Sequence, residues 1–167
     1  MVYELSLSNG TWQETTLYRF DGTVGAYPIS PISIDQGGTL YGTFLNGGTG
    51  SCFLGTCGGV FKLVPQAGDE KKYVFYFNGG QASGNPESGV MVGGNNTVYG
   101  TVGLGDGNVY MLKDENETIL YSFCSLPNCA DGLYPSYGTL VGHDGALYGP
   151  ASAGGQYGFG VVYSVIP

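Results

Sequence analysis

Few side chains in this sequence have the chemistry for catalysis. His143 is the only histidine, and it precedes Asp-Gly in a segment with the composition of a tight turn. Asp21 and Asp131 each precede glycine at matching places, and two carboxylates are the minimum that glycoside hydrolysis requires. Aspartate before glycine is also a common turn former, and we favour that interpretation. The sequence therefore predicts no catalytic residue, and a carboxylate-pair glycoside hydrolase is only a third hypothesis.

Metal and cofactor sites have equally little support. Asp106-Gly107-Asn108 offers oxygen ligands but lacks the spaced ligands of a calcium-binding loop. A zinc site with histidine ligands would have to rest on the single histidine. We therefore expect no metal and no cofactor.

The four cysteines form two close pairs with the same spacing. Cys52 and Cys57 enclose Phe-Leu-Gly-Thr, and Cys124 and Cys129 enclose Ser-Leu-Pro-Asn. We predict that each pair forms a local disulfide, with free thiols or one four-cysteine zinc site as alternatives. Disulfides form and persist in oxidising compartments, so we expect a secreted or cell-surface, extracytoplasmic protein.

Three tyrosines occupy the same place in a recurring motif. Tyr41, Tyr99 and Tyr148 each precede a glycine. One interpretation is core packing between neighbouring units of the fold, since tyrosine has a flat apolar body. The other is a set of aromatic faces on which sugars stack. Glycine beside each tyrosine would let a ligand or another backbone approach closely.

Composition excludes several partners. The formal net charge is −8, and only five residues are Lys or Arg. A nucleic-acid binder needs a basic surface to displace counterions from phosphates, so we expect no nucleic-acid partner. No apolar run approaches the roughly 20 residues that span a bilayer, so we expect no membrane insertion. The 32 glycines together with 14 tyrosines and 8 phenylalanines are typical of a folded, turn-rich, all-β protein.

Four short motifs recur in the same order along the chain. The first motif lies at 17–20, 74–77 and 120–123, and the second, a turn with glycine and proline, lies at 25–28, 84–86 and 132–135. The third lies at 40–43, 98–101 and 147–150, and the fourth at 60–63, 109–112 and 162–165. Each motif mixes aromatic and β-branched residues and is bounded by turn formers, which indicates strands. A fixed order of strands repeated along a chain is the signature of a repeat architecture.

The motifs predict a single β-repeat domain over residues 1–167, with four strands per unit. The units cover residues 14–64, 71–112 and 118–166, and a spare strand covers residues 2–7. In the fourth motif we expect the aromatic residue to face inward and the residue after it outward. The inward residues are Phe61, Tyr110, Tyr163 and, in the spare strand, Tyr3. The charged run at 113–118 is expected to be a linker loop.

The spare strand has no place in the three units. Val2, Tyr3, Glu4 and Leu5 form an extra copy of the fourth motif ahead of the first unit. We expect this strand to pair with a unit from the other end of the chain or with another chain, because an unpaired strand edge is an aggregation liability.

The motifs resemble a known family. Leu-Tyr-Ser-Phe at 120–123, Asp-Gly at 131–132 with proline at 135, Gly-Ala-Leu-Tyr-Gly at 145–149 and Gly-Val-Phe-Lys-Leu at 59–63 are similar to the GloVer-type tandem repeat of bacterial "choice-of-anchor" secreted and surface proteins. The resemblance covers nearly the whole chain. It implies propeller-like blades on a secreted or surface-attached protein, and it brings no catalytic residue. Three blades are too few for a closed propeller, which has about four to eight. A β-trefoil, with three units of four strands, is the alternative fold.

These observations favour a structural or interaction module over an enzyme. The leading hypothesis is an extracytoplasmic β-repeat protein that assembles with itself through its terminal strands, as a homo-oligomer or a fibre. The alternative is a glycan-binding, lectin-like module, with carbohydrate as its partner at Tyr41, Tyr99 and Tyr148.

Overall fold

The computed structural model describes residues 1–64, 71–79, 84–136, 141–143 and 145–167. Within these residues the protein is all-β, with antiparallel strands and one short 3-10 helix, η1 (Pro127–Cys129). The strands are β1 (Val2–Ser8), β2 (Thr11–Tyr18), β3 (Ser33–Ile34), β4 (Leu40–Phe44), β5 (Gly59–Val64), β6 (Lys71–Tyr76), β7 (Met91–Val92), β8 (Thr97–Val102), β9 (Asn108–Lys113), β10 (Asn116–Ser122), β11 (Val141–His143), β12 (Ala146–Ala151) and β13 (Val161–Val165). The predicted all-β class is confirmed.

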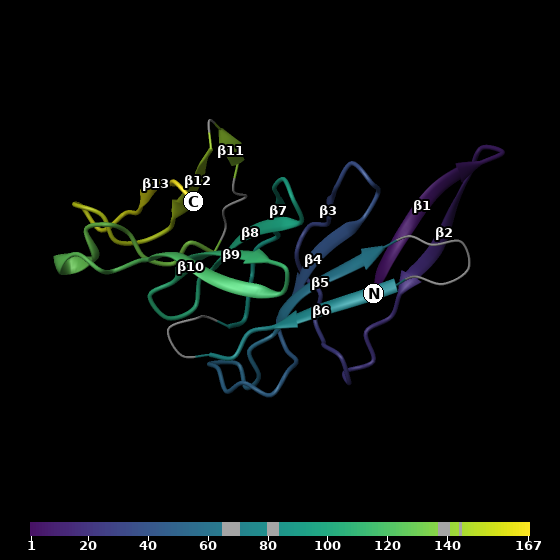
Figure 1. The fold of residues 1–167 in the computed structure, drawn as a ribbon, viewed down its shortest axis with the longest axis horizontal. Helices are drawn as coiled ribbons and strands as arrows, with labels where there is room; N and C mark the ends of the chain where they lie inside the picture. The colour runs from purple at the N-terminus through teal and green to yellow at the C-terminus, as the bar shows by residue number, and fades with distance from the viewer. Residues whose placement is uncertain (65–70, 80–83, 137–140, 144) are drawn as a thin grey trace.

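The strands form four separate sheets in which each strand pairs with its neighbours in the sequence. The N-terminal hairpin is β1-β2, the first sheet is β3-β4-β5-β6, the middle sheet is β7-β8-β9-β10, and the C-terminal sheet is β11-β12-β13. The four sheets follow one another along the long axis of the molecule, from the projecting hairpin at one end to the C-terminal sheet at the other (Figure 1). The two inner sheets have four strands, and the two end sheets have fewer.

The sheets divide the chain at other places than the predicted units do. The predicted boundary lies between residues 64 and 71, yet β5 and β6 pair along their whole length, from Gly59 with Tyr76 to Val64 with Lys71. The first motif of each predicted unit therefore forms the last strand of the preceding sheet. The recurring motifs predict the length of a unit, but they do not show which of its four strands comes first in a sheet. Only the pairing of the strands shows where each sheet begins.

The spare strand has a partner in its own chain. β1 pairs antiparallel with β2, from Val2 opposite Tyr18 to Ser8 opposite Thr11, with a bulge after Val2. One edge of this strand is therefore taken by β2, and the expected pairing with another unit or with another chain stays a prediction for its other edge. The turn between the strands is Asn9-Gly10, both with positive φ, which is a favoured two-residue hairpin turn.

The charged run at 113–118 was also assigned incorrectly as a linker. Asp114 and Glu115, with φ of 48° and 63°, form a two-residue turn, and β10 begins directly after them at Asn116. Positive φ at both central residues gives the turn whose twist matches the flanking strands. Charged residues are common in such exposed hairpin turns. The sequence pattern therefore did not distinguish this hairpin from a linker.

Three apolar clusters fill the spaces between successive sheets. The first joins the N-terminal hairpin to the first sheet and is built around Val2, Phe44, Phe61 and Leu63. The second joins the first sheet to the middle sheet and includes Tyr41, Val60, Val98, Tyr110 and Leu112. The third joins the middle sheet to the C-terminal sheet and includes Val109, Phe123, Leu147, Ala151 and Tyr163. Each sheet between two others therefore has apolar residues on both faces.

One glycine in each of the three sheets lies beneath an aromatic ring of the neighbouring strand. Gly42, Gly100 and Gly149 are opposite Phe61, Tyr110 and Tyr163, respectively. A Cβ at these glycines would lie 2.5, 2.3 and 2.4 Å from the nearest atom of those rings. Absence of a side chain therefore lets each ring lie flat across its neighbouring strand. The glycine beside the repeated tyrosine serves this internal contact.

The inward direction of the fourth-motif aromatics is confirmed in the three sheets but not in the hairpin. Phe61, Tyr110 and Tyr163 are buried, whereas 51% of Tyr3 is exposed and Val2 is buried instead. Val2 packs on the first sheet, and no sheet among the described residues lies on the Tyr3 side of the hairpin. Burial of this aromatic thus depends on a preceding sheet, and among the described residues the hairpin has none.

Candidate functional site

The three repeated tyrosines lie at the same position of three different sheets. Tyr41 is opposite Lys62, Tyr99 is opposite Met111, and Tyr148 is opposite Ser164. Their exposure differs: 4% of Tyr41 and 42% of Tyr148 is accessible, and Tyr99 is half-buried. The structure therefore does not bring them together in one sugar-stacking surface.

Tyr41 is held in place by polar contacts as well as by packing. Its hydroxyl donates a hydrogen bond to Oδ2 of Asp35 at 3.2 Å, and Nζ of Lys62 lies 5.6 Å from its ring centroid. Burial, with the hydrogen bond and charge of Asp35, raises the pKa of Tyr41 to about 12. A buried, neutral tyrosine with both a packed ring and a bonded hydroxyl acts as a core residue. Of the two interpretations of this position, core packing fits Tyr41.

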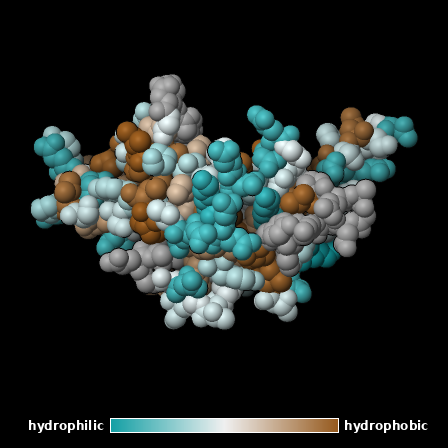
Figure 2. All heavy atoms as spheres, in the orientation of Figure 1, coloured by the Kyte–Doolittle hydropathy of each residue, from teal (hydrophilic) through white to brown (hydrophobic). Residues whose placement is uncertain are grey.

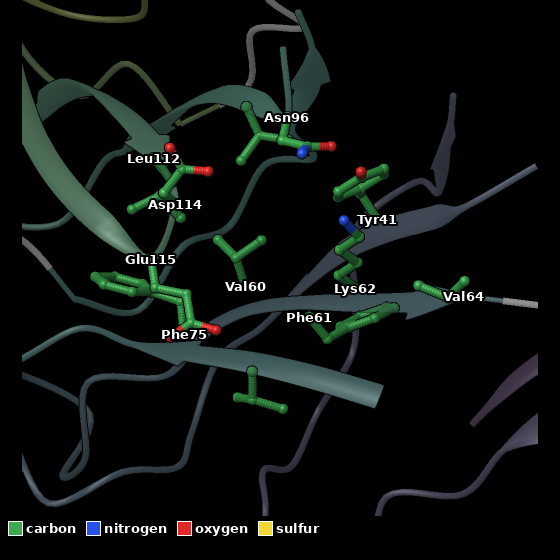
Figure 3. Close-up of a pocket in the computed structure, with 12 residues that line it drawn as sticks. Tyr41, Val60, Phe61, Lys62, Val64, Phe75, Asn96, Leu112, Asp114 and Glu115 are labelled. Carbon is green, nitrogen blue, oxygen red and sulfur yellow. The ribbon is translucent and has the colours of Figure 1, made fainter. Parts of the chain in front are cut away.

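A cleft is lined by residues of both the first and the middle sheet. Its volume is about 280 Å³, its floor includes Val60 and Leu112, and its rim carries Lys62 from β5 with Asp114 and Glu115 from the β9–β10 turn (Figure 3). An apolar floor with few charged groups is the usual make-up of a small-molecule site. The charges here are spread along the rim, and no group of three or more metal-binding side chains occurs in the described part of the chain.

A second, more polar hollow lies between two turns of the same sheets. It measures about 610 Å³ and is lined by residues of the β3–β4 and β7–β8 turns, among them Asp35, Gln36, Asn95 and Asn96. Tyr41 and Asn96 line both this hollow and the cleft. Side-chain amides and a carboxylate offer hydrogen-bond donors and acceptors without strong net charge. Groups of this kind can exchange hydrogen bonds with ligand hydroxyls.

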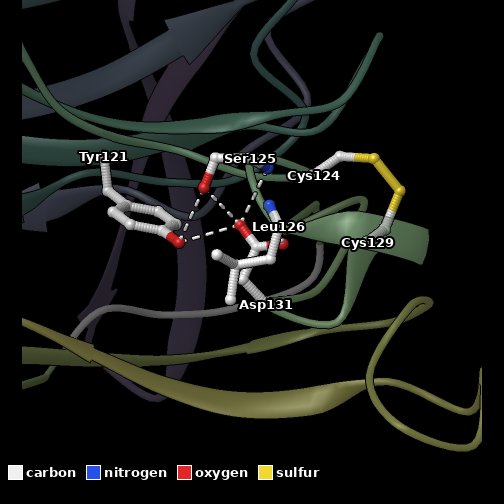
Figure 4. Close-up of a disulfide and its surroundings, with 6 residues drawn as sticks. All are labelled: Tyr121, Cys124, Ser125, Leu126, Cys129 and Asp131. Atoms are coloured by element: carbon white, nitrogen blue, oxygen red, sulfur yellow. Dashed lines mark hydrogen bonds between the residues drawn. A yellow bond between two sulfur atoms is a disulfide. The ribbon is translucent and has the colours of Figure 1, made fainter.

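Asp131 organises the second cysteine loop. Its carboxylate accepts hydrogen bonds from the Tyr121 hydroxyl at 2.8 Å, from the Ser125 hydroxyl at 2.8 Å, and from the backbone N–H groups of Ser125 and Leu126 at 3.0 and 3.2 Å (Figure 4). Desolvation opposes ionisation, but these donors outweigh it and lower the pKa of Asp131 to about 2. A carboxylate with four donors holds a loop in shape and has no proton to give at neutral pH.

The other predicted catalytic candidates also have local roles. Asp21 accepts hydrogen bonds from the hydroxyl and the backbone N–H of Thr23, at 2.6 and 2.9 Å, and these donors lower its pKa. His143 ends β11, where it pairs with Ala146. The turn residue at 144 lies outside the described residues. Aspartate as turn former, the interpretation favoured from sequence, therefore fits both Asp21 and Asp131.

Both predicted disulfides are present. Cys52 is bonded to Cys57 and Cys124 to Cys129, and no free cysteine remains. The alternatives of a zinc site and free thiols are thereby excluded. Two disulfides are compatible with an extracytoplasmic protein.

The C-terminal sheet ends at an open strand edge. β13 pairs with β12 on one side, and among the described residues no strand lies along its other side. A groove of about 350 Å³ runs beside this edge, between Val161–Val165 on one side and Tyr121 and Asp131 on the other. The equivalent edges of β5 and β9 are covered by β6 and β10.

The N-terminal hairpin projects from the opposite end of the molecule. Its cross-strand register places Tyr3, Leu5, Leu7 and Trp12 on one face together with Glu14 and Thr16, and the four apolar side chains are exposed. The other face carries polar residues, namely Glu4, Ser6, Ser8, Thr11, Gln13 and Thr15. Apolar atoms on the projecting hairpin are visible in Figure 2. A large apolar face open to water marks an interaction surface.

Only part of this hairpin surface was predictable from the sequence. The sequence predicted an assembly strand at Val2, Tyr3, Glu4 and Leu5, and this stays a prediction. It did not predict the apolar side chains that continue this hairpin face through Leu7 and Trp12. Alternation of apolar and polar residues over positions 3–8 is the signal that would have found it.

Comparison of the chain with protein-family models, with curated proteins and with solved structures found no match. Among the described residues, no helix has the length and apolar character needed to cross a membrane.

Proposed function

We propose that this protein is an extracytoplasmic β-repeat module that assembles with copies of itself through its terminal strands. One observation carries the proposal: both inner sheets have four strands, whereas the end sheets have two and three. The strands β5 and β9 of the inner sheets pair on both sides, whereas their counterparts at the ends, β1 and β13, each have one edge without a partner among the described residues. A strand edge of this kind can pair with another chain.

We also propose that the sheets are propeller-like blades of three tandem repeats. Support comes from the strand order within each sheet, from the face-to-face clusters between sheets, and from the contact between the short strands β3 and β7. Separate four-stranded sheets fit blades better than the barrel of a β-trefoil. Membership in the GloVer-type repeats stays a prediction. Secretion or surface attachment also stays a prediction, with which the two disulfides are compatible.

Native mass in solution tests self-assembly. The full chain is measured by light scattering on a size-exclusion column over a wide range of concentrations, beside a variant that lacks residues 1–10. We expect the mass of the full chain to exceed that of one copy and to rise with concentration, and the truncated variant to remain monomeric. A full chain that stays monomeric at every concentration contradicts the proposal.

The second candidate function is binding of a small glycan. The polar hollow of about 610 Å³ between the turns of the first and middle sheets favours it, because Gln36, Asn95 and Asn96 offer hydrogen bonds suited to sugar hydroxyls. A glycan array probed with the native protein and with Asn96→Ala tests it. Binding that Asn96→Ala weakens about tenfold supports this function, and signals at background level for the native protein reject it.

A further inference from the structure

The contact between the first and middle sheets has a definite direction. The first sheet contributes Tyr41 and Val60, which lie on one of its faces together with Lys62. The middle sheet contributes Tyr110 and Leu112, which lie on the face of that sheet that does not carry its repeated tyrosine, Tyr99. We call the face that bears the repeated tyrosine the forward face, and the face that bears the fourth-motif aromatic the backward face.

The same contact occurs once more in the chain. The middle sheet presents Tyr99 and Val109 on its forward face, and the C-terminal sheet meets them with Leu147 and Tyr163 on its backward face. Tyr99 and Val109 occupy the positions of Tyr41 and Val60 in their sheet. Two successive sheets are therefore joined by equivalent residues in the same orientation.

The C-terminal sheet has a forward face with nothing on it. Tyr148, Pro150, Val162 and Ser164 share that face, because Tyr148 is opposite Ser164 and Pro150 is opposite Val162. All four are exposed, and 82% of Val162 is accessible to water. Their counterparts in the first sheet, Tyr41, Thr43 and Val60, are buried by the middle sheet.

The N-terminal hairpin has an uncovered backward face. Its strand β1 is the counterpart of β5, β9 and β13, and its bulge after Val2 corresponds to the bulge in β10 between Ile119 and Tyr121. Tyr3 and Leu5 take the positions of Tyr110 and Leu112, which makes the Tyr3 side a backward face. Tyr3 is 51% exposed and Leu5 is 53% exposed, and no forward face covers them in the described chain.

We propose that the forward face of the C-terminal sheet of one copy packs on the backward face of the N-terminal hairpin of a second copy, head to tail. The inference rests on the proposed self-assembly and names its surface. A second copy is the partner that the structure favours, because each exposed face carries the residue types that bury its counterpart inside the chain. Tyr148 and Val162 would contact Tyr3 and Leu5 as Tyr41 and Val60 contact Tyr110 and Leu112.

Such a contact uses two different surfaces, so every added copy leaves one of each exposed. Contacts of this kind form a ring if the rotation between copies closes and an open filament if it does not. The net charge of −8 on each copy opposes association, and salt screens that repulsion. Assembly is therefore expected to strengthen as salt is raised.

Complementation between two blocked variants tests the contact. Val162→Arg blocks the forward face, and Leu5→Arg blocks the backward face; both side chains are exposed, so the fold is expected to tolerate the changes. We expect each variant alone to be monomeric by light scattering. An equimolar mixture should form dimers and nothing larger, because only one intact face of each kind remains. Ile29→Arg, at a similarly exposed isoleucine outside both faces, should assemble as the native chain does.

The outcomes separate this contact from self-assembly in general. If the native chain assembles and both variants still assemble alone, the two faces are not the contact, and pairing along the open edge of β13 takes its place. A mixture that stays monomeric also overturns the head-to-tail contact, although self-assembly would stand. A native chain that is monomeric at every concentration and salt overturns both.

Discussion

Two carboxylates show how local surroundings set opposite protonation behaviour in one protein. Asp131 has four hydrogen-bond donors, and its pKa falls to about 2. Glu117, on β10, has an Oε1 atom that is buried without a hydrogen-bond partner, and burial raises its pKa to about 7. The difference is in donors: both groups lose water, but only Asp131 receives hydrogen bonds in exchange.

Glu117 should make stability depend on pH. Because its pKa rises from 4.5 to about 7 on folding, the folded state holds the proton more tightly than the unfolded state does. The free energy of unfolding should therefore fall as pH rises from about 4.5 to about 7, and level off above that. Glu117→Gln should remove this fall. Urea unfolding at a series of pH values between 4.5 and 8 measures it.

A matched control separates Glu117 from the general effect of removing a negative charge. Asp106 is an exposed aspartate in the β8–β9 turn, outside both proposed contact faces, and Asp106→Asn removes one negative charge, so we expect this variant to keep the fall in stability that the native chain shows. Equal pH dependence in the native chain and in Glu117→Gln would show that the carboxyl of Glu117 is solvated.

At the scale of the strand, the contact between glycine and an aromatic ring recurs in all three sheets and predicts a large effect of a small change. In Gly100→Ala the added Cβ would lie 2.3 Å from the hydroxyl oxygen of Tyr110, whose side chain is fully buried and has little room to move. Overpacking of this kind costs roughly 1–3 kcal/mol. Thermal or urea unfolding of the variant measures the loss.

The control for this substitution lies in the neighbouring turn. Gly94 has nothing within 4 Å of an added Cβ, so Gly94→Ala tests the same chemical change without the ring contact. We expect its stability to lie within about 0.5 kcal/mol of the native chain, as is usual for exposed sites. Comparable losses in both variants would contradict the ring contact.

The two disulfide loops should differ in their reactivity toward reductants. Cys57 is fully buried and its partner Cys52 is half-buried, whereas Cys124 and Cys129 are both half-buried, so the first disulfide has one cysteine open to attack and the second has two. Thiol–disulfide exchange needs access of the attacking thiolate to sulfur. Under mild reductant, alkylation followed by mass spectrometry should therefore detect Cys124 and Cys129 first. Faster labelling of Cys52 and Cys57 would contradict this order.

Strand positions were largely predictable from sequence, and strand partners were not. The third motif at 40–43 became β4, and the fourth at 60–63 became part of β5, because aromatic and β-branched residues between turn formers favour strands wherever they pair. Pairing of β6 with β5 could not be predicted, since the repeat period has no marked starting strand. Exposure of Tyr3 also could not be predicted, because it depends on whether a sheet precedes the hairpin.

At the scale of the whole molecule, each apolar cluster of the described residues joins two sheets that are neighbours in the row. The middle sheet is covered on both faces, whereas the hairpin and the C-terminal sheet are each covered on one. In such one-dimensional arrangements stability is approximately a sum over units and the contacts between neighbours. The ends are therefore expected to open more often than the middle.

Amide hydrogen exchange measures that gradient. In dilute protein we expect β8 and β9 to exchange slowest, and β1, β2 and β13 to exchange several-fold faster. At concentrations where copies associate, protection should rise at the ends and stay unchanged in the middle sheet. Uniform protection along the row in dilute protein would contradict the prediction.

The repeated contact between forward and backward faces has a consequence for how the length of such a chain can change. A new sheet inserted between two existing ones brings one forward and one backward face, so it meets its neighbours through the contacts that they already make with each other. Gain or loss of whole sheets is then nearly neutral for packing, as long as both end faces are kept. Natural variants and designed ones can therefore differ in the number of sheets while they share the same joints.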